Sequence, residues 1–214
     1  MAGIITALEP QKRSKDRVNV YLDGEFAFGL AAIHAVNLRV GLWLSDEEAA
    51  ALKAADEVER AREKALDYLS YRPRSEAELQ RYLLDRDFSE AVAEDVMQRL
   101  RSVGLVDDRE FARYWVENRV RFRPRGKRAL VQELRQNGVA PEVIEEALAG
   151  FDEVAAVKGV FEEQARRLAH LPPDLFRRRL IERLVRRGFP YGVIEEILAA
   201  YTFPISKSDE SEDS

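Results

Sequence analysis

Apolar and polar residues alternate in two short runs near the start of the chain, from residue 18 to 22 and from residue 26 to 30. Asp23 and Gly24 lie between the runs, and this pair favours a two-residue turn in which both positions have positive φ. The pattern predicts a β-hairpin with one apolar face, and GIITALEP (residues 3–10) is predicted to add a third strand. The apolar positions are Val18, Val20, Leu22, Phe26, Phe28 and Leu30.

From Ser45 onward the apolar positions take the three- and four-residue spacing of amphipathic helices. Helix starts are marked by a capping residue with an acid three positions later, as in Ser45-x-x-Glu48, Ser75-x-x-Glu78 and Asp107-x-x-Glu110. Prolines that suit a first helical turn are Pro141, Pro173 and Pro190. Gly138 and Gly188 suit helix ends, because a residue with positive φ closes the last turn.

One block of the sequence occurs three times. Leu130-x-x-x-Leu134-x-x-x-Gly138-Val139, followed by VIEEAL (143–148), recurs 50 residues later as Leu180-x-x-x-Leu184-x-x-x-Gly188-Phe189, followed by VIEEIL (193–198). A copy 51 residues upstream reads Leu79-x-x-x-Leu83-x-x-x-Asp87-Phe88, followed by VAEDVM (92–97). A helical stretch precedes each copy, near residues 56–70, 107–121 and 153–169. Such self-similarity predicts tandem repeats of one small unit.

The predicted fold is mainly α, with three tandem three-helix repeats in an elongated array after a small β-rich segment. The predicted divisions are a β segment (1–44), three repeats (45–104, 105–151 and 152–203) and an acidic disordered tail (204–214). The predicted cores are Leu79, Leu83, Phe88, Val92 and Val96; then Leu130, Leu134, Val139, Val143 and Ala147; then Leu180, Leu184, Phe189, Val193 and Ile197.

Three stretches together resemble the RecX family of RecA regulators: YLSYRPRSEAELQRYLLDRDFS (68–89), VGLVDDREFARYWVENRV (103–120) and RGKRALVQELRQNGV (125–139). The similarity covers about residues 56–200, and Asp87 stands where the family commonly has glycine. The resemblance implies a non-catalytic cytoplasmic protein of DNA repair, homologous recombination and the SOS response. Such a protein binds the RecA–single-stranded DNA filament in its helical groove and inhibits recombinase, ATPase and coprotease activity.

The composition and motifs of the sequence give little support to an enzymatic function. The chain of 214 residues has no cysteine, which excludes thiolate catalysis and disulfides. His34 and His170 lack metal-ligand spacing, and the glycine-rich phosphate loops are absent. Asp107, Asp108 and Glu110 are the one candidate for Mg²⁺, but helix capping explains Asp107 and Glu110 without a metal. We expect no cofactor, no metal and no membrane span.

Positive charge is concentrated in two runs although the chain carries a formal net charge of -5. Each run, from Arg113 to Arg128 and from Arg166 to Arg187, carries a local charge of +6. Such concentration favours contact with an anionic partner over a solvated face. The candidate partner-binding residues are Arg119, Arg121, Arg123, Arg125, Lys127, Arg128, Arg177, Arg178, Arg179, Arg183, Arg186 and Arg187.

Helical spacing predicts the orientation of individual side chains in these runs. Phe122 can either stack on a base or pack inward, and inward packing is the favoured expectation. Arg179, Arg183, Arg186 and Arg187 are expected to lie opposite the core positions of their helix. The expected partners are a RecA filament and, through weaker direct contact, single-stranded DNA, with the chain acting as a monomer. The alternatives are a helix-turn-helix-like DNA-binding regulator and a helical-repeat scaffold for another protein. Acids at the start of the third helices, including Glu142, Glu145 and Glu195, disfavour the DNA-reading alternative because they repel phosphate.

Overall fold

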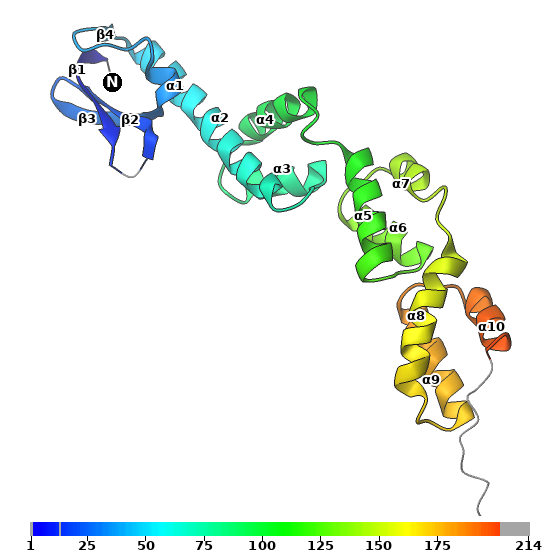
Figure 1. Cartoon of the computed structure of the whole chain (residues 1–214). Coiled ribbons are helices and arrows are strands. Elements are labelled where there is room, and N and C mark those ends of the chain that lie inside the picture. Colours follow the sequence, from blue (N-terminus) through cyan, green and yellow to red (C-terminus); the bar gives the residue numbers. More distant parts are fainter. Residues whose placement is uncertain (1, 13, 202–214) are drawn as a thin grey trace, which may run out of the picture. The chain divides into compact units, whose positions relative to one another are not determined.

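The computed structural model describes residues 2–12 and 14–201, so the predicted acidic tail lies outside the described residues. The described elements are β1 (Gly3–Gln11), β2 (Ser14–Leu22), β3 (Glu25–Ala31), α1 (Ala32–Ala35), β4 (Trp43–Leu44), α2 (Asp46–Ser70), α3 (Glu76–Leu84), α4 (Glu90–Ser102), α5 (Asp108–Phe122), α6 (Lys127–Gln136), α7 (Pro141–Ala147), α8 (Glu153–Leu168), α9 (Pro173–Arg186) and α10 (Tyr191–Ala199). The chain forms two compact units that divide between Phe111 and Ala112, within α5. The predicted fold class is confirmed: a small sheet is followed by three three-helix repeats, α2–α4, α5–α7 and α8–α10 (Figure 1).

The N-terminal sheet is antiparallel, with strand order β3-β2-β1-β4. The predicted turn between β2 and β3 is confirmed, since Asp23 has φ 50° and Gly24 has φ 90°. The predicted third strand is β1, and the sequence pattern missed β4, which pairs with Gly3 and Ile4 through only two residues. The face that carries Val20 and Leu22 is buried.

Phe26 departs from the predicted apolar face and is 58% exposed. A register shift between Val20 and Tyr21 places Phe26 opposite Tyr21, and the two rings pack edge to face with centroids 5.9 Å apart. A bulge adds one residue to a strand and therefore moves the following side chain to the other face of the sheet. Strict alternation could not predict this change.

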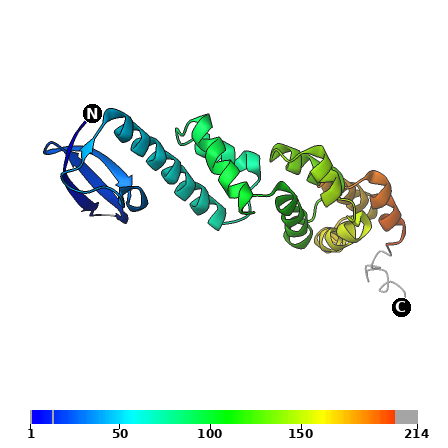
Figure 2. The same cartoon turned by 90° about the horizontal axis from the view of Figure 1, so that it is seen from above.

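Helix α2 covers the buried face of the sheet and then continues as the leading helix of the first repeat (Figure 2). The leading helix is therefore longer than the predicted stretch 56–70. Asp56 on α2 is 5% exposed and accepts hydrogen bonds from the Ala31 backbone at 2.6 Å and from the Arg17 guanidinium at 2.8 Å. Through these two hydrogen bonds the Asp56 carboxylate connects α2 to both β2 and β3.

The predicted helix ends are confirmed in most cases. Ser45 and Ser75 form capping boxes with Glu48 and Glu78. Positive φ occurs at the second-helix ends of all three repeats, at Asp87 (63°), Gly138 (81°) and Gly188 (87°). Pro141 and Pro173 occupy the first helical turn, whereas Pro190 is the N-cap of α10 and lies just outside the helix.

The leucine pairs predicted for the second helices are all fully buried, at 0% exposure for Leu79, Leu83, Leu130, Leu134, Leu180 and Leu184. The prediction for the third helices is wrong by one position. Val143, Ala147, Val193 and Ile197 are only half-buried, and the next residues are buried instead: Ile144, Leu148, Ile194 and Leu198. In the first repeat Val96 is buried as predicted, but Val92 is half-buried beside buried Ala93.

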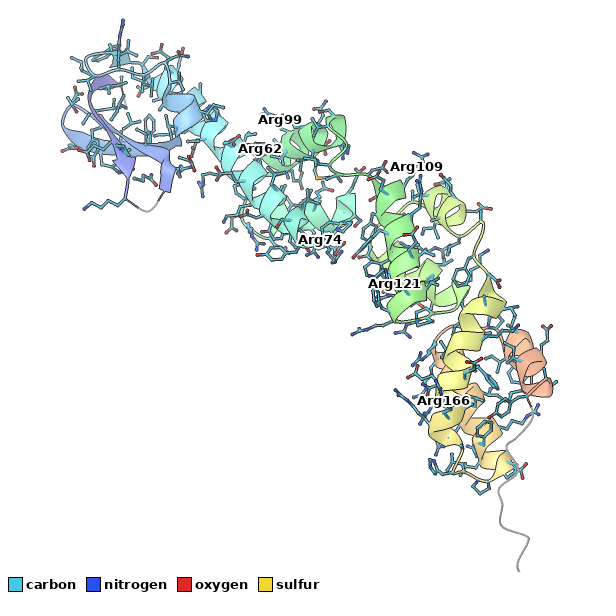
Figure 3. All side chains as sticks on the ribbon, in the orientation of Figure 1. Arg62, Arg74, Arg99, Arg109, Arg121 and Arg166 are labelled. Carbon is cyan, nitrogen blue, oxygen red and sulfur yellow. The ribbon has the colours of Figure 1, made fainter. Side chains whose placement is uncertain are left out.

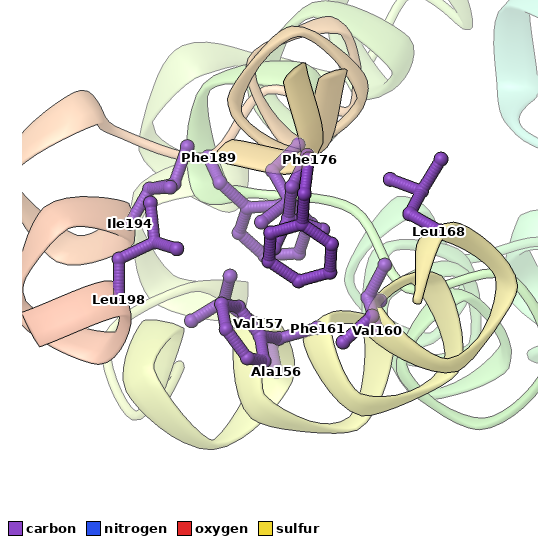
Figure 4. Close-up of a cluster of buried hydrophobic side chains, with 12 residues drawn as sticks. Ala156, Val157, Val160, Phe161, Leu168, Phe176, Phe189, Ile194 and Leu198 are labelled. Atoms are coloured by element: carbon purple, nitrogen blue, oxygen red, sulfur yellow. The ribbon is translucent and has the colours of Figure 1, made fainter. Parts of the chain in front are cut away.

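The third repeat shows why the second set of apolar positions is the buried one. Ile194 and Leu198 point from α10 towards Val157 and Phe161 on α8, and Phe176 and Phe189 belong to the same cluster (Figure 4). VIEEIL offers two adjacent apolar stripes about 100° apart around the helix. Packing against the leading helix selects the second of them.

Replacement of Asp56 by alanine tests the attachment of α2 to the sheet. The Ala31 amide and the Arg17 guanidinium would lose their acceptor, so we expect the free energy of unfolding to fall by about 1–3 kcal/mol. Asp95→Ala is the control, because Asp95 makes an exposed pair with Arg99 and its loss should cost about 0.5 kcal/mol. Urea unfolding followed by circular dichroism measures both, and equal losses would contradict the assignment.

Candidate functional site: a basic surface at the junction of α6 and α9

Two arginines of the first basic run share one structural partner. Arg119 donates to Glu133 at 2.6 Å, and Arg125 lies 3.6 Å from the same carboxylate. The Trp115 indole also donates to Glu133 at 2.9 Å, and the Arg119 guanidinium lies over the Trp115 ring at 4.5 Å. Glu133, which the sequence pattern did not single out, therefore neutralises part of the run and ties α5 to α6.

Arg113 lies 3.9 Å from Glu146. The other four basic residues of this run are exposed and have no acidic partner among the described residues: Arg121, Arg123, Lys127 and Arg128. Figure 3 labels Arg121 near the C-terminal end of α5, where its guanidinium lies 5.2 Å from the centroid of the Phe122 ring. The expectation that Phe122 packs inward is wrong, since this side chain is 65% exposed. Phe122 lies about 120° around the helix from buried Val116, so it points away from the packed face.

The second basic run is largely engaged within its own repeat. Arg177 pairs with Glu195, and Arg178 and Arg179 each approach Glu182 at 3.2 Å. Arg167 also pairs with Glu163 at 2.6 Å. The last three arginines of the run form no ion pair among the described residues: Arg183, Arg186 and Arg187.

The expectation that Arg183 and Arg187 lie opposite the core positions of their helix is wrong. Arg183 is half-buried and donates to the side-chain oxygen of buried Gln164 at 2.8 Å. Arg183 and Arg187 both fall within about 60° of Leu180 around the helix, on the side that faces α8. Arg179 and Arg186 are exposed, as the sequence predicted.

The two runs, about sixty residues apart in the sequence, meet through a glycine contact. The Gly126 amide donates to the Arg187 carbonyl oxygen at 2.9 Å. A Cβ atom on Gly126 would overlap the backbone carbonyl of Gly188, and one on Gly188 would lie 2.5 Å from Cβ of Ala129. Only glycine permits so close a backbone approach, and Gly188 also needs positive φ.

This contact assembles a basic surface from the two runs. We call it the α6–α9 basic surface and define it by the five cations that flank the glycine contact and have no ion pair among the described residues: Arg123, Lys127, Arg128, Arg186 and Arg187. Like charges gathered in this way attract polyanions or acidic protein surfaces more strongly than the same charges dispersed.

In two repeats, a carboxylate from the repeat that follows in the chain caps the N-terminus of the second helix. The Lys127 amide at the start of α6 donates to Glu153 of α8 at 2.9 Å. The Glu76 amide at the start of α3 donates in the same way to Asp108 of α5, also at 2.9 Å. A negative group at a helix N-terminus satisfies a free donor and interacts favourably with the helix dipole.

This arrangement explains the acid pair that the sequence offered as a metal site. Asp107 accepts from the Arg109 amide at 2.7 Å and caps α5, while Asp108 caps α3. Within residues 2–12 and 14–201, no three acidic or histidine side chains gather in a way that could hold a metal ion. Both aspartates have structural roles.

Residues 72–79 of the first repeat (RPRSEAEL, an R-x-R-S-x-x-E-L motif within the stretch 68–89) also form a structural network. Glu78 completes the Ser75 capping box and pairs with Arg72 at 2.6 Å and Arg74 at 3.6 Å. Burial would raise the pKa of Glu78, but the hydrogen bonds and charge of the arginines lower that pKa overall. The guanidinium of Arg74, which Figure 3 labels, also lies over the Tyr68 ring, 3.8 Å from its centroid. These arginines are therefore engaged in joining α2 to α3.

A sheet followed by tandem three-helix repeats defines the structural class of this chain, and comparison with known proteins gives the family. Family models match it as the regulatory protein RecX N-terminal domain (residues 3–44), the RecX first three-helix domain (61–100) and the RecX second three-helix domain (107–148). The chain belongs to the RecX family of regulatory proteins. No helix in the described part of the chain is long and apolar enough to cross a membrane.

Individual relatives agree over most of the chain. Regulatory protein RecX of Bacillus licheniformis is 32% identical over 91% of this chain and 76% of its own length. Regulatory protein RecX of a Geobacillus species is 33% identical over 99% of this chain and 79% of its own. A crystal structure of regulatory protein RecX matches with a TM-score of 0.71 and 30% identity, covering 93% of this chain and all of that one.

Gly126→Ala tests the glycine contact that joins the two basic runs. The added methyl group would overlap the Gly188 carbonyl, so we expect a loss of about 1–3 kcal/mol in stability. Gly192→Ala is the control, because nothing lies within 4 Å of a Cβ at that position. Thermal unfolding of the two variants should separate them clearly, and equal midpoints would show that the contact is not needed.

Asp108→Asn tests the carboxylate cap of α3 through its pH dependence. Burial raises the pKa of Asp108 above its ordinary value. Above that raised pKa the folded protein bears the cost of a half-buried charge, whereas asparagine keeps an oxygen acceptor without charge. We expect the variant to be at least as stable as the wild type at pH 7, and this advantage to shrink as the pH falls through the raised pKa. A variant clearly less stable at pH 7 than at pH 4, relative to wild type, would contradict this account.

Proposed function

We propose that this chain binds the RecA–single-stranded DNA filament in its helical groove and modulates RecA, mostly by inhibiting its recombinase, ATPase and coprotease activities. The α6–α9 basic surface is the observation that carries the proposal, since an acidic chain gathers five cations there without acidic partners among its described residues. Membership of a family of regulatory proteins supports the same conclusion.

The proposed mechanism is binding without catalysis. A filament presents acidic protein surfaces and DNA phosphates at regular intervals, and arginine suits both because its planar fork forms paired hydrogen bonds. Several modest contacts from tandem repeats add through their effective concentration. A monomer held across neighbouring RecA subunits would fix their geometry and block access to the groove. We place this action in the cytoplasm, with the repeats 45–104, 105–151 and 152–203 as the binding units.

The twelve candidate residues divide by their local partners. The cations without ion pairs among the described residues are proposed as direct contacts: Arg121, Arg123, Lys127, Arg128, Arg183, Arg186 and Arg187. The ion-paired members are proposed to exchange partners on binding or to position their neighbours: Arg119, Arg125, Arg177, Arg178 and Arg179. Direct DNA contact is the weaker part of the interaction.

A helix-turn-helix mode of DNA reading has less support. The start of α7 presents the exposed carboxylates of Glu142, Glu145 and Glu146, and a recognition helix must bring this end close to the phosphate backbone. These charges would repel DNA. The structure gives no comparable objection to a protein scaffold, so failure to act on RecA filaments would favour that alternative.

RecA ATPase activity on single-stranded DNA, titrated with this protein at two salt concentrations, tests the proposal. We expect inhibition at well below one chain per RecA subunit. Arg128→Glu with Arg186→Glu should lower the inhibitory potency by about tenfold, or about 1.4 kcal/mol, because it reverses charge on both sides of the glycine contact. If phosphates contribute, potency should fall by roughly 0.7 log units per contact for each log unit of salt.

Arg60→Glu with Lys64→Glu is the matched control, since both residues are exposed on α2 and the change in net charge is the same. This variant should inhibit nearly as well as the wild type. Equal potency of the α6–α9 variant and the wild type would refute the assigned surface, and absence of inhibition by the folded wild type would refute the function.

A further inference from the structure

The second unit contains an apolar groove that the basic runs do not explain. The groove has a volume of about 620 Å³ and lies between α5 and α8. Val116 and Val120 of α5 line it, together with Ala155, Ala156 and Gly159 of α8. Phe151, just before α8, also belongs to the lining. The side chain of Val120 lines this groove and is 45% exposed, so an apolar surface is open to a partner.

Gly159 gives an independent reason to regard the groove as a site. It lies inside the 16-residue helix α8, where glycine costs about 1 kcal/mol relative to alanine. Its φ is not positive, and apart from its chain neighbours and the backbone of its own helix no atom lies within 4 Å of the place where a Cβ would stand. Nothing in the described fold therefore requires glycine here. Its absence of a side chain leaves the groove open to another molecule.

Charge at the rim indicates the chemistry of the occupant. Glu117 lines the groove, is exposed, and pairs with no Arg or Lys of the described chain. It is also the single acid between Arg113 and Arg128. A carboxylate beside apolar walls repels phosphate and attracts a cation, so the groove suits a protein segment and disfavours nucleic acid.

We propose that the α5–α8 groove is a docking site for a segment of the partner protein that presents an apolar side chain next to a lysine or arginine. The apolar side chain enters between Val120 and Gly159, and the cation pairs with Glu117. This inference rests on the proposed function and makes the partner a RecA subunit of the filament. Buried apolar anchors of this kind supply most of the energy of protein interfaces, while surrounding charges set orientation.

Gly159→Leu tests the groove by filling it. The side chain meets open space and leucine favours helix, so the unfolding midpoint should equal or exceed that of the wild type. Binding of the labelled full-length chain to RecA–single-stranded DNA filaments should weaken at least tenfold, while affinity for bare single-stranded DNA should not change. Gly192→Leu is the matched control, because Gly192 is another helical glycine with open surroundings but lies outside the groove. It should bind filaments within twofold of the wild type.

Glu117→Lys tests the groove at an exposed position, by distinguishing a specific cation contact from general attraction to a polyanion. Added positive charge would strengthen binding if only general attraction to a polyanion mattered, whereas the groove predicts filament binding at least threefold weaker. Filament binding by Gly159→Leu or by Glu117→Lys at wild-type strength or above, with the wild type itself binding, would overturn the groove and leave the proposed function intact. Failure of the folded wild type to bind filaments would overturn both.

Discussion

Helix ends leave backbone groups without partners, and the second unit depends on how two such ends satisfy each other. The Gly126 amide at the start of α6 meets the Arg187 carbonyl at the end of α9, and Glu153 accepts from the next amide of α6. The positive end of one helix dipole thus faces the negative end of another. Side chains at Gly126 or Gly188 would prevent this approach, so two glycines allow the second and third repeats to share their helix ends.

The same contact has an electrostatic cost. It gathers Lys127 and Arg128 beside Arg186 and Arg187, and like charges at short range repel each other. Glu133, Glu153 and Glu182 offset part of this repulsion through their contacts with neighbouring basic residues and amides. An anionic partner would relieve the remaining repulsion. If that partner is a nucleic acid, pairing of these cations with phosphates also releases the counterions condensed on the nucleic acid.

The second unit therefore has two surfaces of different chemistry. The α6–α9 basic surface suits either a nucleic acid or an acidic protein surface, whereas the apolar groove with Glu117 at its rim suits a protein partner. Separate sites for charge and for an apolar anchor allow affinity and salt dependence to vary independently. The first unit has no such surplus in its R-x-R-S motif, because Arg72 and Arg74 share Glu78 and hold α2 against α3.

The sequence alone determined the hairpin turn at Asp23-Gly24, the capping boxes, the leucine pairs and the three-fold repeat, because these depend on residues close together in the chain. It also indicated every basic residue of the candidate surface. The tertiary structure decided which apolar stripe of VIEEIL is buried, the exposure of Phe26 and Phe122, and the engagement of Arg183 with Gln164. Above all it joined two distant basic runs at Gly126 and Gly188. Periodicity fixes the spacing of side chains within an element, but the face that is buried and the helix ends that meet depend on packing between elements.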